Sequence, residues 1–259
     1  MLVEKIPLAV AIITKDEEEN IGDCLQSVAW ASQIVVVDSG SKDKTLSIAA
    51  QYNCETHQED WRGFGAQKQS AIDKCTLPWI LLLDADERVP AETAAAIKQI
   101  VLNAAVREAG FSFPRKNYFQ GRWIKHAGWW PDRVIRLFRN KAGRMTEASV
   151  HEAVAVEGAV SKIDFPLEHF TESRLNKIIL KIDKYSTLGA TEAFKQGKRA
   201  SLAGALLRAV FTFHQDYFLR LGIMDGMPGL TLAVTDAINK FFKYAKLHEL
   251  HRNNQDGKP

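Results

Sequence analysis

The chain of 259 residues is predicted to fold as an α/β domain, a mostly parallel sheet flanked by helices, with a C-terminal helical extension. Short apolar runs alternate with helical patterns up to about residue 165, which is the element order of βαβ units. Acidic or polar clusters follow three of these runs. Beyond Glu172 the pattern changes to long amphipathic helices. We therefore expect two domains, residues 1–170 and residues 171–259.

The strands of the first domain are predicted from apolar and β-branched runs. Residues 8–14, 34–37 and 79–83 are the continuous apolar segments expected of buried parallel strands. Helical patterns lie between and after them, and two more strand patterns follow. The helices are expected over 21–28, 43–52, 67–75 and 90–103, and the further strands over 110–114 and 134–138.

The extension is predicted to contain helices over 177–194, 202–221 and 230–246, with residues 226–229 as the loop between the last two. It carries 14 Lys and Arg against 8 Asp and Glu, whereas residues 1–170 have a net charge of −3. A basic amphipathic segment suits contact with an acceptor or an anionic membrane surface. An oligomer interface or packing against the sheet domain explains the pattern equally well, and a solvated helix face almost as well.

The composition favours a cytosolic protein. Cys24, Cys54 and Cys75 are odd in number and far apart, which argues against a disulfide framework or a zinc site. The N-terminus has charged residues where an export signal would be apolar, and no apolar run reaches about 18 residues. We expect no nucleic-acid partner.

The three polar clusters follow the predicted strands directly. Thr14 and Glu17 follow the first strand, Asp38 the second, and Asp84 and Asp86 the third. In an open parallel sheet, ligands bind outside the carboxyl ends of the strands. Three such clusters on one edge predict a site that uses oxygen ligands.

The motif Asp84-Ala85-Asp86 is the most informative of these clusters. Strand alternation would point both carboxylates to the same side, where they suit Mg²⁺ or Mn²⁺ and the phosphates that such an ion recruits. The ion would neutralise charge on a departing diphosphate. The alternative is a polar strand end that caps the next helix, and the context of three clusters favours the metal.

The segment from Asp38 to Thr45 has two interpretations. Ser41 and Asp43 are good helix-capping residues and Gly40 is a turn former. Alternatively, Asp38 contacts a nucleoside and the backbone near Gly40 approaches the ligand. The absence of a Gly-x-Gly-x-x-Gly pattern argues against a dinucleotide-binding dehydrogenase.

Three motifs, in this order and spacing, resemble a family 2 glycosyltransferase. They are Ile-Thr-Lys-Asp-Glu-Glu-Glu-Asn-Ile ending at Ile21, Val-Val-Val-Asp-Ser-Gly-Ser-Lys-Asp-Lys-Thr ending at Thr45, and Leu-Leu-Leu-Asp-Ala-Asp-Glu ending at Glu87. The resemblance implies a GT-A fold and transfer with inversion at the anomeric carbon. It covers the first 90 or so residues closely.

The resemblance also implies roles for single residues. Thr14 and Glu17 would line a uridine pocket, and Asp38 would contact the base or ribose. Asp84 would lie near the ribose and sugar of the donor, and Asp86 would bind Mg²⁺ or Mn²⁺. Ser39 is a departure, because many relatives have a second acidic residue there.

The middle of the chain is similar to lipopolysaccharide inner-core β-1,4-glucosyltransferases of the WaaE/LgtF type. The similarity lies in the segment 115–132, in Arg136-Leu-Phe-Arg139, in Val-His151-Glu152 and in the tail from 222. It implies transfer of glucose from UDP-glucose to a lipid-linked heptose. The protein would then be cytoplasmic, or peripheral on the cytoplasmic face of the inner membrane.

An inverting transfer needs a general base for the acceptor hydroxyl, and a carboxylate is the expected type. Glu152 and Asp132 are the two candidates, and Glu152 is preferred because it follows the Arg-x-x-Arg strand. His151 is a candidate for holding the metal or diphosphate, and equally for a buried histidine. Arg136 and Arg139 are candidates for a diphosphate clamp, although surface salt bridges are the commoner role of a single arginine.

Three tryptophans, Trp123, Trp129 and Trp130, are candidates for stacking on the acceptor sugar, with core packing as the alternative.

Two other functions compete with glycosyl transfer. A Mg²⁺-dependent phosphotransferase would normally have its nucleophilic aspartate after the first strand, whereas Asp84 and Asp86 follow a later one. A non-catalytic nucleotide- or carbohydrate-binding module would keep its function when Asp86 or Glu152 is replaced.

Overall fold

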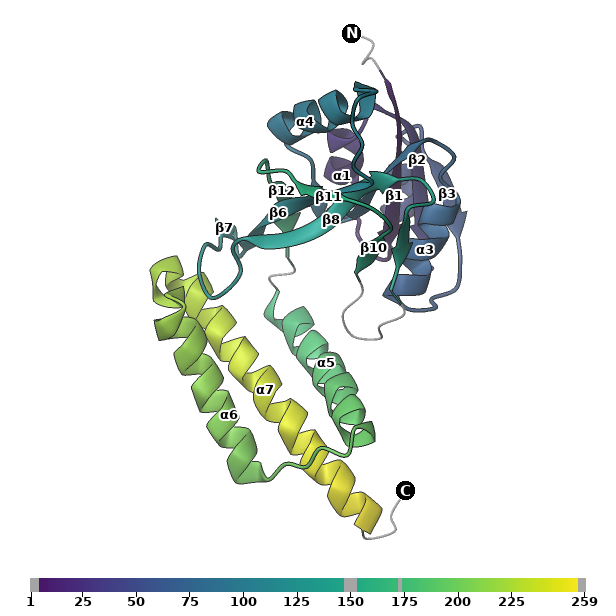
Figure 1. Ribbon diagram of the computed structural model, residues 1–259. Helices are drawn as coiled ribbons and strands as arrows, with labels where there is room; N and C mark the ends of the chain where they lie inside the picture. Colours follow the sequence, from purple (N-terminus) through teal and green to yellow (C-terminus); the bar gives the residue numbers. More distant parts are fainter. Residues whose placement is uncertain (1–4, 147–152, 172–173, 256–259) are drawn as a thin grey trace. The chain divides into compact units, whose positions relative to one another are not determined.

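The computed structural model describes residues 5–146, 153–171 and 174–255 (Figure 1). The chain divides into two compact units. The sheet unit comprises residues 1–116 and 132–170, and the helical unit comprises residues 117–131 and 171–259. The predicted boundary at residue 170 thus leaves out the segment 117–131, which contacts the helices of the extension.

The sheet unit is built from alternating strands and helices in its first half and from strands in its second half. The helices are α1 (Ile21–Ser27), α2 (Thr45–Ala49), α3 (Phe64–Asp73) and α4 (Ala91–Leu102). The strands up to α4 are β1 (Ile6–Thr14), β2 (Ala31–Asp38), β3 (Glu55–Gln58), β4 (Trp79–Asp84) and β5 (Glu87–Arg88). The later strands are β6 (Gly110–Phe119), β7 (Arg122–Trp123), β8 (Asp132–Arg139), β9 (Gly143–Met145), β10 (Val154–Val156), β11 (Val160–Lys162) and β12 (Leu167–Phe170).

The main sheet has the strand order β3-β2-β1-β4-β8-β6-β12-β5. Strands β3, β2, β1 and β4 are parallel, whereas β4 pairs with β8, and β8 with β6, in antiparallel fashion. The predicted α/β class is therefore confirmed, and the antiparallel strands belong to the later half of the unit. The parallel strands are connected by the βαβ crossovers that the apolar segments predicted.

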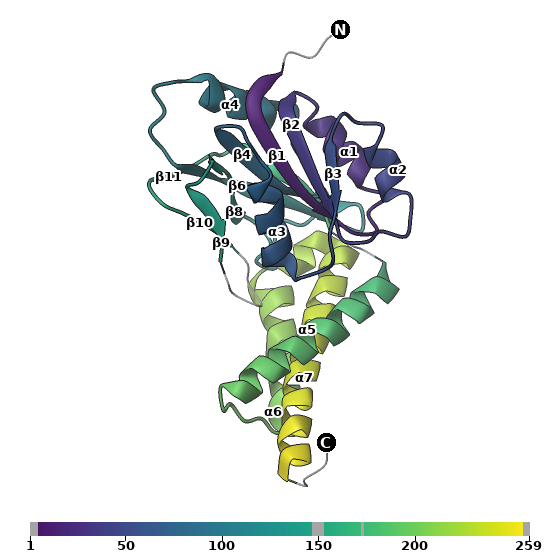
Figure 2. The ribbon, with the colours of Figure 1, turned by 90° about the vertical axis from the view of Figure 1, so that its right-hand side faces the viewer.

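Two apolar layers cover the two faces of this sheet (Figure 2). Alternate residues of β1 point to opposite sides: Leu8, Val10 and Ile12 pack with α1, α2 and α4, and Ala9 and Ala11 pack with α3. Because both faces of β1, β2 and β4 are covered, the inner parts of these strands are apolar and do not alternate with polar residues. Strand β3, at the edge of the sheet, is polar and mostly exposed.

The helical unit contains α5 (Leu175–Lys195), α6 (Leu202–His214) and α7 (Gly226–Gln255). Both α5 and α6 pack along α7, as Figure 1 shows. The segment 117–131 joins this unit through Asp225, whose carboxylate accepts hydrogen bonds from the backbone N–H groups of Lys125 and His126. None of the helices among the described residues is long and apolar enough to cross a membrane.

Two boundaries predicted for this unit are wrong. The helix expected over 202–221 ends at His214 and is followed by a π-helical turn, η1 (Gln215–Leu219). The expected loop 226–229 is the first turn of α7, and the connection is instead the 3₁₀ turn η2 (Gly222–Asp225). Pro228 is tolerated there because the first N–H groups of a helix have no partner within the helix.

Candidate active site

The ends of three neighbouring strands form the site. Strand β1 lies between β2 and β4, with Thr14 opposite Asp38 and Ile13 opposite Asp84. The three polar clusters predicted from the sequence therefore lie side by side at the carboxyl edge of the parallel strands. This edge is where an open sheet of this type binds its ligands.

The loops after β1 and β2 are locked together by hydrogen bonds. Asp38 is fully buried, and its Oδ1 accepts hydrogen bonds from the N–H groups of Gly40 (2.9 Å) and Ser41 (3.0 Å). The N–H of Glu17 donates to Thr45 Oγ1 at 2.8 Å, and Glu17 Oε2 accepts from Asn20 Nδ2 at 2.8 Å. In this structure Asp38 and Glu17 shape the loops through these contacts.

Two buried hydroxyl groups at this edge have no hydrogen-bond partner among the described residues. They are Thr14 Oγ1, at the end of β1, and Ser39 Oγ, directly after β2. Buried polar atoms without a partner are uncommon and need an explanation. A bound ligand with polar groups would supply the missing partners, so these hydroxyls mark the edge as a ligand site.

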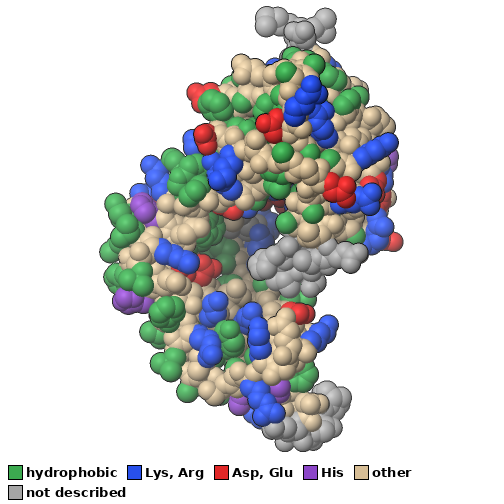
Figure 3. Space-filling view, viewed as in Figure 1, with side chains coloured by type: hydrophobic (Ala, Val, Ile, Leu, Met, Phe, Trp, Pro, Cys, Tyr) green, Lys and Arg blue, Asp and Glu red, His purple; other side chains and the backbone are tan. Residues whose placement is uncertain are grey.

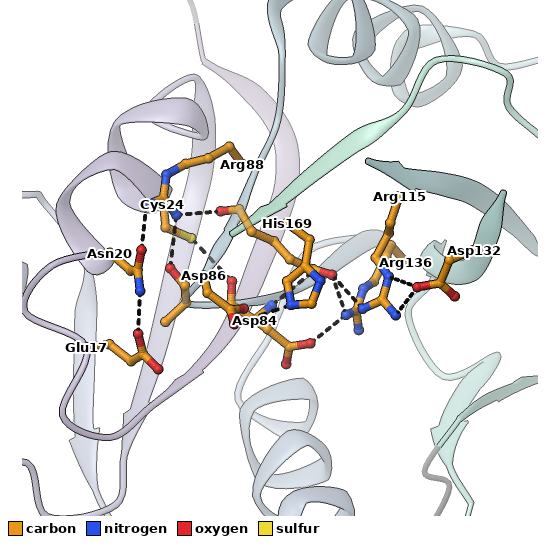
Figure 4. A network of polar contacts seen from close by, with 12 residues as sticks. Glu17, Asn20, Cys24, Asp84, Asp86, Arg88, Arg115, Asp132, Arg136 and His169 are labelled. Atoms are coloured by element: carbon orange, nitrogen blue, oxygen red, sulfur yellow. Dashed lines mark hydrogen bonds and ion pairs between the residues drawn. The ribbon is translucent and has the colours of Figure 1, made fainter. Parts of the chain in front are cut away.

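Asp84 lies in a network of charged side chains (Figure 4). Its Oδ1 is 2.7 Å from Lys68 Nζ, and its Oδ2 is 2.6 Å from Arg136 Nη2. The same Arg136 nitrogen lies 2.7 Å from Oε1 of Glu87, whose side chain is fully buried. Two cations and two carboxylates are thus brought together from α3, β8, β4 and β5.

This network shifts the pKa values of its members. Burial works against the charged form of Asp84, but Lys68 and Arg136 outweigh it and hold the pKa of the carboxyl well below its usual range. Burial also works against the charge of Arg136, yet Glu87 and Asp84 raise its pKa. Both shifts favour the charged forms, an anionic Asp84 and a cationic Arg136.

Asp86 lies next to these groups in Figure 4 and contacts His169 on β12. Asp86 Oδ2 is 3.3 Å from His169 Nε2, and the backbone O of Asp86 accepts from the N–H of Phe170 at 2.9 Å. Burial works against protonation of His169, but the hydrogen bond and charge of Asp86 raise its pKa. Strand β4 ends at Asp84, so strand alternation does not extend to Asp86 and the two aspartates have different partners.

The carboxylate of Asp86 and the imidazole of His169 are the groups that fit a divalent ion here. Among the described residues, no three His, Cys, Asp or Glu side chains form a metal cluster. Mg²⁺ sites in nucleotide-binding enzymes often use one or two protein groups, with substrate phosphates and water completing the coordination. Asp86 supplies one such carboxylate, and His169 would be a second ligand in its neutral form, after it has lost its proton.

Asp132 begins β8 and is held by Arg115. The guanidinium of Arg115 donates to Asp132 Oδ2 from Nη2 at 2.6 Å and from Nε at 3.0 Å. Its third contact, 3.2 Å from Nη1 to Glu87 Oε1, joins Asp132 to the network around Asp84. Figure 4 shows Arg115 between Asp132 and Arg136.

The predicted role of Arg139 in donor binding is not supported. Arg139 pairs with Trp79, at the beginning of β4, whereas Asp84 is at the end of that strand. Its guanidinium donates to the backbone O atoms of Glu108 and Val106 and lies over the Trp79 ring. It therefore stabilises the opposite edge of the sheet.

His151 and Glu152 lie outside the described residues. A cavity of about 1160 Å³ borders α3 and β9, and its lining includes Phe64, Gln69 and Met145. None of the described residues predicted for donor or metal binding lines this cavity. We therefore locate the candidate site by the strand ends and not by this cavity.

Sequence reasoning missed three residues of the site: Lys68, Arg115 and His169. Lys68 belongs to a helix, and Arg115 and His169 to strands that follow the three motifs, so no local pattern marks them. The available signal for Arg115 was its position: it is a charged residue in the middle of a strand, directly after the apolar residues Phe113 and Pro114.

An α/β fold that gathers polar groups at the carboxyl edge of its parallel strands has the ligand-binding arrangement of open α/β sheets. The family model described as glycosyl transferase family 2 matches residues 9–159, more than half of the chain. The chain belongs to this family.

Similar proteins extend over nearly the whole chain. The lipopolysaccharide core biosynthesis glycosyltransferase LpsC of Rhizobium meliloti is 33% identical over 267 aligned positions, covering 96% of this chain and 95% of LpsC. An uncharacterized glycosyltransferase of Rickettsia typhi is 25% identical, covering 94% of this chain and 87% of the relative.

Solved structures with similar folds have lower similarity. S. aureus TarS with UDP-GlcNAc aligns at a TM-score of 0.48 and 14% identity, over 97% of this chain and 92% of that chain. Glucosyl-3-phosphoglycerate synthase from Mycobacterium tuberculosis, with Mn²⁺, UDP and phosphoglyceric acid, aligns at 0.47 and 13% identity, over 75% of this chain and 80% of that chain.

Proposed function

We propose that this protein is an inverting, metal-dependent hexosyltransferase that moves glucose from UDP-glucose to a heptose of the lipopolysaccharide inner core. The observation that carries the proposal is the common edge formed by Thr14, Asp38 and the Asp84-Ala85-Asp86 motif. The role of the relative LpsC in lipopolysaccharide core biosynthesis supports a lipopolysaccharide-core acceptor. Glucose and heptose rest on the resemblance of residues 115–152 to inner-core glucosyltransferases.

Asp86 and His169 are the residues proposed to hold Mg²⁺ or Mn²⁺ together with the donor diphosphate. The bound ion supplies Lewis-acid stabilisation of the negative charge on the departing UDP. This set replaces the one expected from the sequence, Asp86 with His151, because His169 is the histidine found beside Asp86. A role for His151 stays a prediction.

Lys68 and Arg136 have a separate task in this proposal. They fix the Asp84 carboxylate from two sides, so that it keeps one orientation toward the ribose or sugar of the donor. Such preorganisation lowers the free-energy cost of ordering the site when substrate binds. Thr14 and Ser39 supply hydroxyl groups for the nucleoside.

Glu152 is the proposed general base, taking the proton from the acceptor hydroxyl as that oxygen attacks the anomeric carbon. The C–O bond to the UDP diphosphate breaks as the new glycosidic bond forms, which inverts the anomeric centre. Asp132 is the second candidate, but Arg115 already holds it in an ion pair, an arrangement typical of a positioning residue. We therefore prefer Glu152.

Membrane association on the cytoplasmic face is part of the proposal, because a lipid-linked acceptor is displayed there. Of 24 large hydrophobic side chains exposed among the described residues, 19 lie between Leu175 and Phe242. Residues 193–215, which include α6, carry four Lys and Arg and no Asp or Glu. Figure 3 shows hydrophobic side chains gathered along α6 and the turns that follow it.

An apolar surface bordered by cations suits the interface of an anionic membrane. We call the exposed residues Leu202, Leu206, Leu207, Val210 and Phe211 the α6 face; they are 53–70% exposed. A second copy of the chain is the rival occupant of this face. The basic charge favours anionic lipid, because two copies would bring like charges together.

The proposal is tested by measuring hydrolysis and transfer across UDP-sugars with Mg²⁺ or Mn²⁺, and again with EDTA. We expect UDP-glucose to be the best donor and EDTA to abolish transfer. Asp86→Asn should lose transfer, and Glu152→Gln should lose transfer while it still binds UDP. Full activity in EDTA would overturn the metal dependence, and unchanged function in both variants would favour the non-catalytic binding module.

A further inference from the structure

A small cavity lies within the helical unit, between α5, α7 and the segment 117–131, and has a volume of about 170 Å³. Part of its wall is apolar and aromatic, with Phe119 and Trp129 meeting edge to face at 6.2 Å between ring centroids. The rest is polar and includes Thr171, Asp236 and Asn239. A packing core would not need this second group of side chains.

The polar wall contains hydrogen-bonding capacity that the described residues do not use. Thr171 Oγ1 and Asn239 Oδ1 are buried without a hydrogen-bond partner among the described residues. Asp236 is three residues before Asn239 on α7, so both lie on one face of the helix. Burial and the nearby charge of Asp216 raise the pKa of Asp236 to about 6, although Lys240 and Arg220 act against the shift.

Buried polar atoms of native proteins are almost always paired, with protein or with a ligand or water. The cavity has room for several waters, since one water takes about 30 Å³ of the liquid. A hydroxyl, an amide and a carboxyl next to two aromatic rings also match the two kinds of surface on a sugar ring, hydroxyl groups and an apolar face.

We propose that this cavity binds one sugar ring of the acceptor saccharide. Thr171, Asp236 and Asn239 would exchange hydrogen bonds with its hydroxyls, and Trp129 would lie against its apolar face. The proposal rests on the proposed function for the acceptor class. It adds a saccharide site in the helical unit, made of residues that none of the three sequence motifs contains.

The test compares three variants in the full-length protein. Asn239→Leu removes the amide of the cavity and Asp236→Asn replaces its carboxyl by an amide. Asn176→Leu makes the matched change at an exposed position of α5 outside the cavity. Two quantities are measured for each variant. One is the KM for a heptose-containing core oligosaccharide and for UDP-glucose, and the other is direct binding of the oligosaccharide without donor, followed by tryptophan fluorescence.

We expect Asn239→Leu and Asp236→Asn to raise the KM for the oligosaccharide about tenfold or more, with the KM for UDP-glucose within twofold of wild type. Their melting temperatures should equal or exceed that of wild type, because Asn239→Leu removes a buried polar group that has no partner among the described residues and Asp236→Asn removes a charge that burial disfavours. Asn176→Leu should leave both KM values unchanged. A higher melting temperature together with weaker acceptor use is the result that a purely structural role would not give.

The proposal is overturned if both cavity variants bind the oligosaccharide as wild type does, or if wild type does not bind it at all. Failure of the proposed function gives a different result. In that case the protein neither hydrolyses nor transfers from UDP-glucose, while the oligosaccharide still binds and Asn239→Leu still weakens its binding.

Discussion

Replacing Arg136 by methionine should destabilise the sheet unit strongly at neutral pH. The Arg136 guanidinium is 6% exposed and lies 2.6 Å from Asp84 and 2.7 Å from Glu87. Removing one partner of a buried ion pair costs about 3–5 kcal/mol, because the remaining charge stays buried. Lys68 still contacts Asp84 at 2.7 Å and Arg115 still contacts Glu87 at 3.2 Å, so we expect the lower end, about 3 kcal/mol.

The loss should depend on pH. The pKa of Asp84 is lowered in the folded protein, so its contribution to stability is present above the unfolded value of 3.8 and is lost as the pH falls toward the folded value. In Arg136→Met the pKa of Asp84 rises, so acidification removes less of the free energy of unfolding from the variant than from wild type. The difference between wild type and variant should therefore be largest near pH 7 and should shrink below about pH 4.

Calorimetric melting between pH 7 and pH 3.5 measures the effect. A loss of about 3 kcal/mol corresponds to about 6–12 °C for a unit of this size. Arg139→Met is the matched control, because the Arg139 guanidinium donates hydrogen bonds to the backbone carbonyls of Glu108 and Val106. The reasoning is refuted if Arg136→Met melts no lower than Arg139→Met at pH 7, or if its deficit is the same at both pH values.

Three further predictions concern other parts of the molecule. His169→Asn should raise the Mn²⁺ concentration for half-maximal transfer about tenfold or more, since one of two protein groups is lost; an unchanged Mn²⁺ titration would exclude His169 from the metal site. Asp236→Asn should stabilise the helical unit at pH 7.5 by up to about 3 kcal/mol, because the pKa of Asp236 is raised from 3.8 to about 6. The gain should vanish toward pH 4 in thermal melts, and a pH-independent gain would contradict the raised pKa of Asp236. The double variant Leu207→Asp with Phe211→Asp should no longer sediment with anionic vesicles, while its UDP binding stays normal. The control Leu102→Asp, at a position 63% exposed in the sheet unit, should sediment like wild type. Vesicle binding by the double variant, or a stable dimer at the α6 face, would oppose the membrane assignment.

Strands β1, β2 and β4 of the parallel half were predictable because each is a short apolar run between polar loops, whereas the polar edge strand β3 has no such run and was missed. The runs that became β1, β2 and β4 are buried on both faces, so their sequences contain almost no polar residues until the strand ends. The clusters at Thr14, Asp38 and Asp84 were therefore visible as breaks in apolar sequence. Their common edge followed from the rule that parallel strands align their carboxyl ends.

The partners of Asp84 and Asp86 were not predictable in the same way. Lys68 is 16 residues before Asp84 and Arg136 is 52 residues after it, so their contacts depend on how α3 and β8 pack. His169 reaches Asp86 because β12 pairs antiparallel with β5. Strand β5 has only two residues, so its sequence contains no pattern that predicts this pairing. The start of α7 at Gly226 was missed because Gly and Pro usually mark loops, although a first helical turn accepts them.

The central claim is that the strand-end acids bind a nucleotide diphosphate together with a divalent ion. The most direct measurement is calorimetric titration of UDP into wild type and Asp86→Asn, each with Mn²⁺ and with EDTA. Asp23→Asn is the control, since the Asp23 side chain is 83% exposed. We predict that Mn²⁺ strengthens UDP binding to wild type and Asp23→Asn about tenfold or more but leaves Asp86→Asn unchanged. Equal affinity of wild type for UDP in Mn²⁺ and in EDTA would contradict the claim.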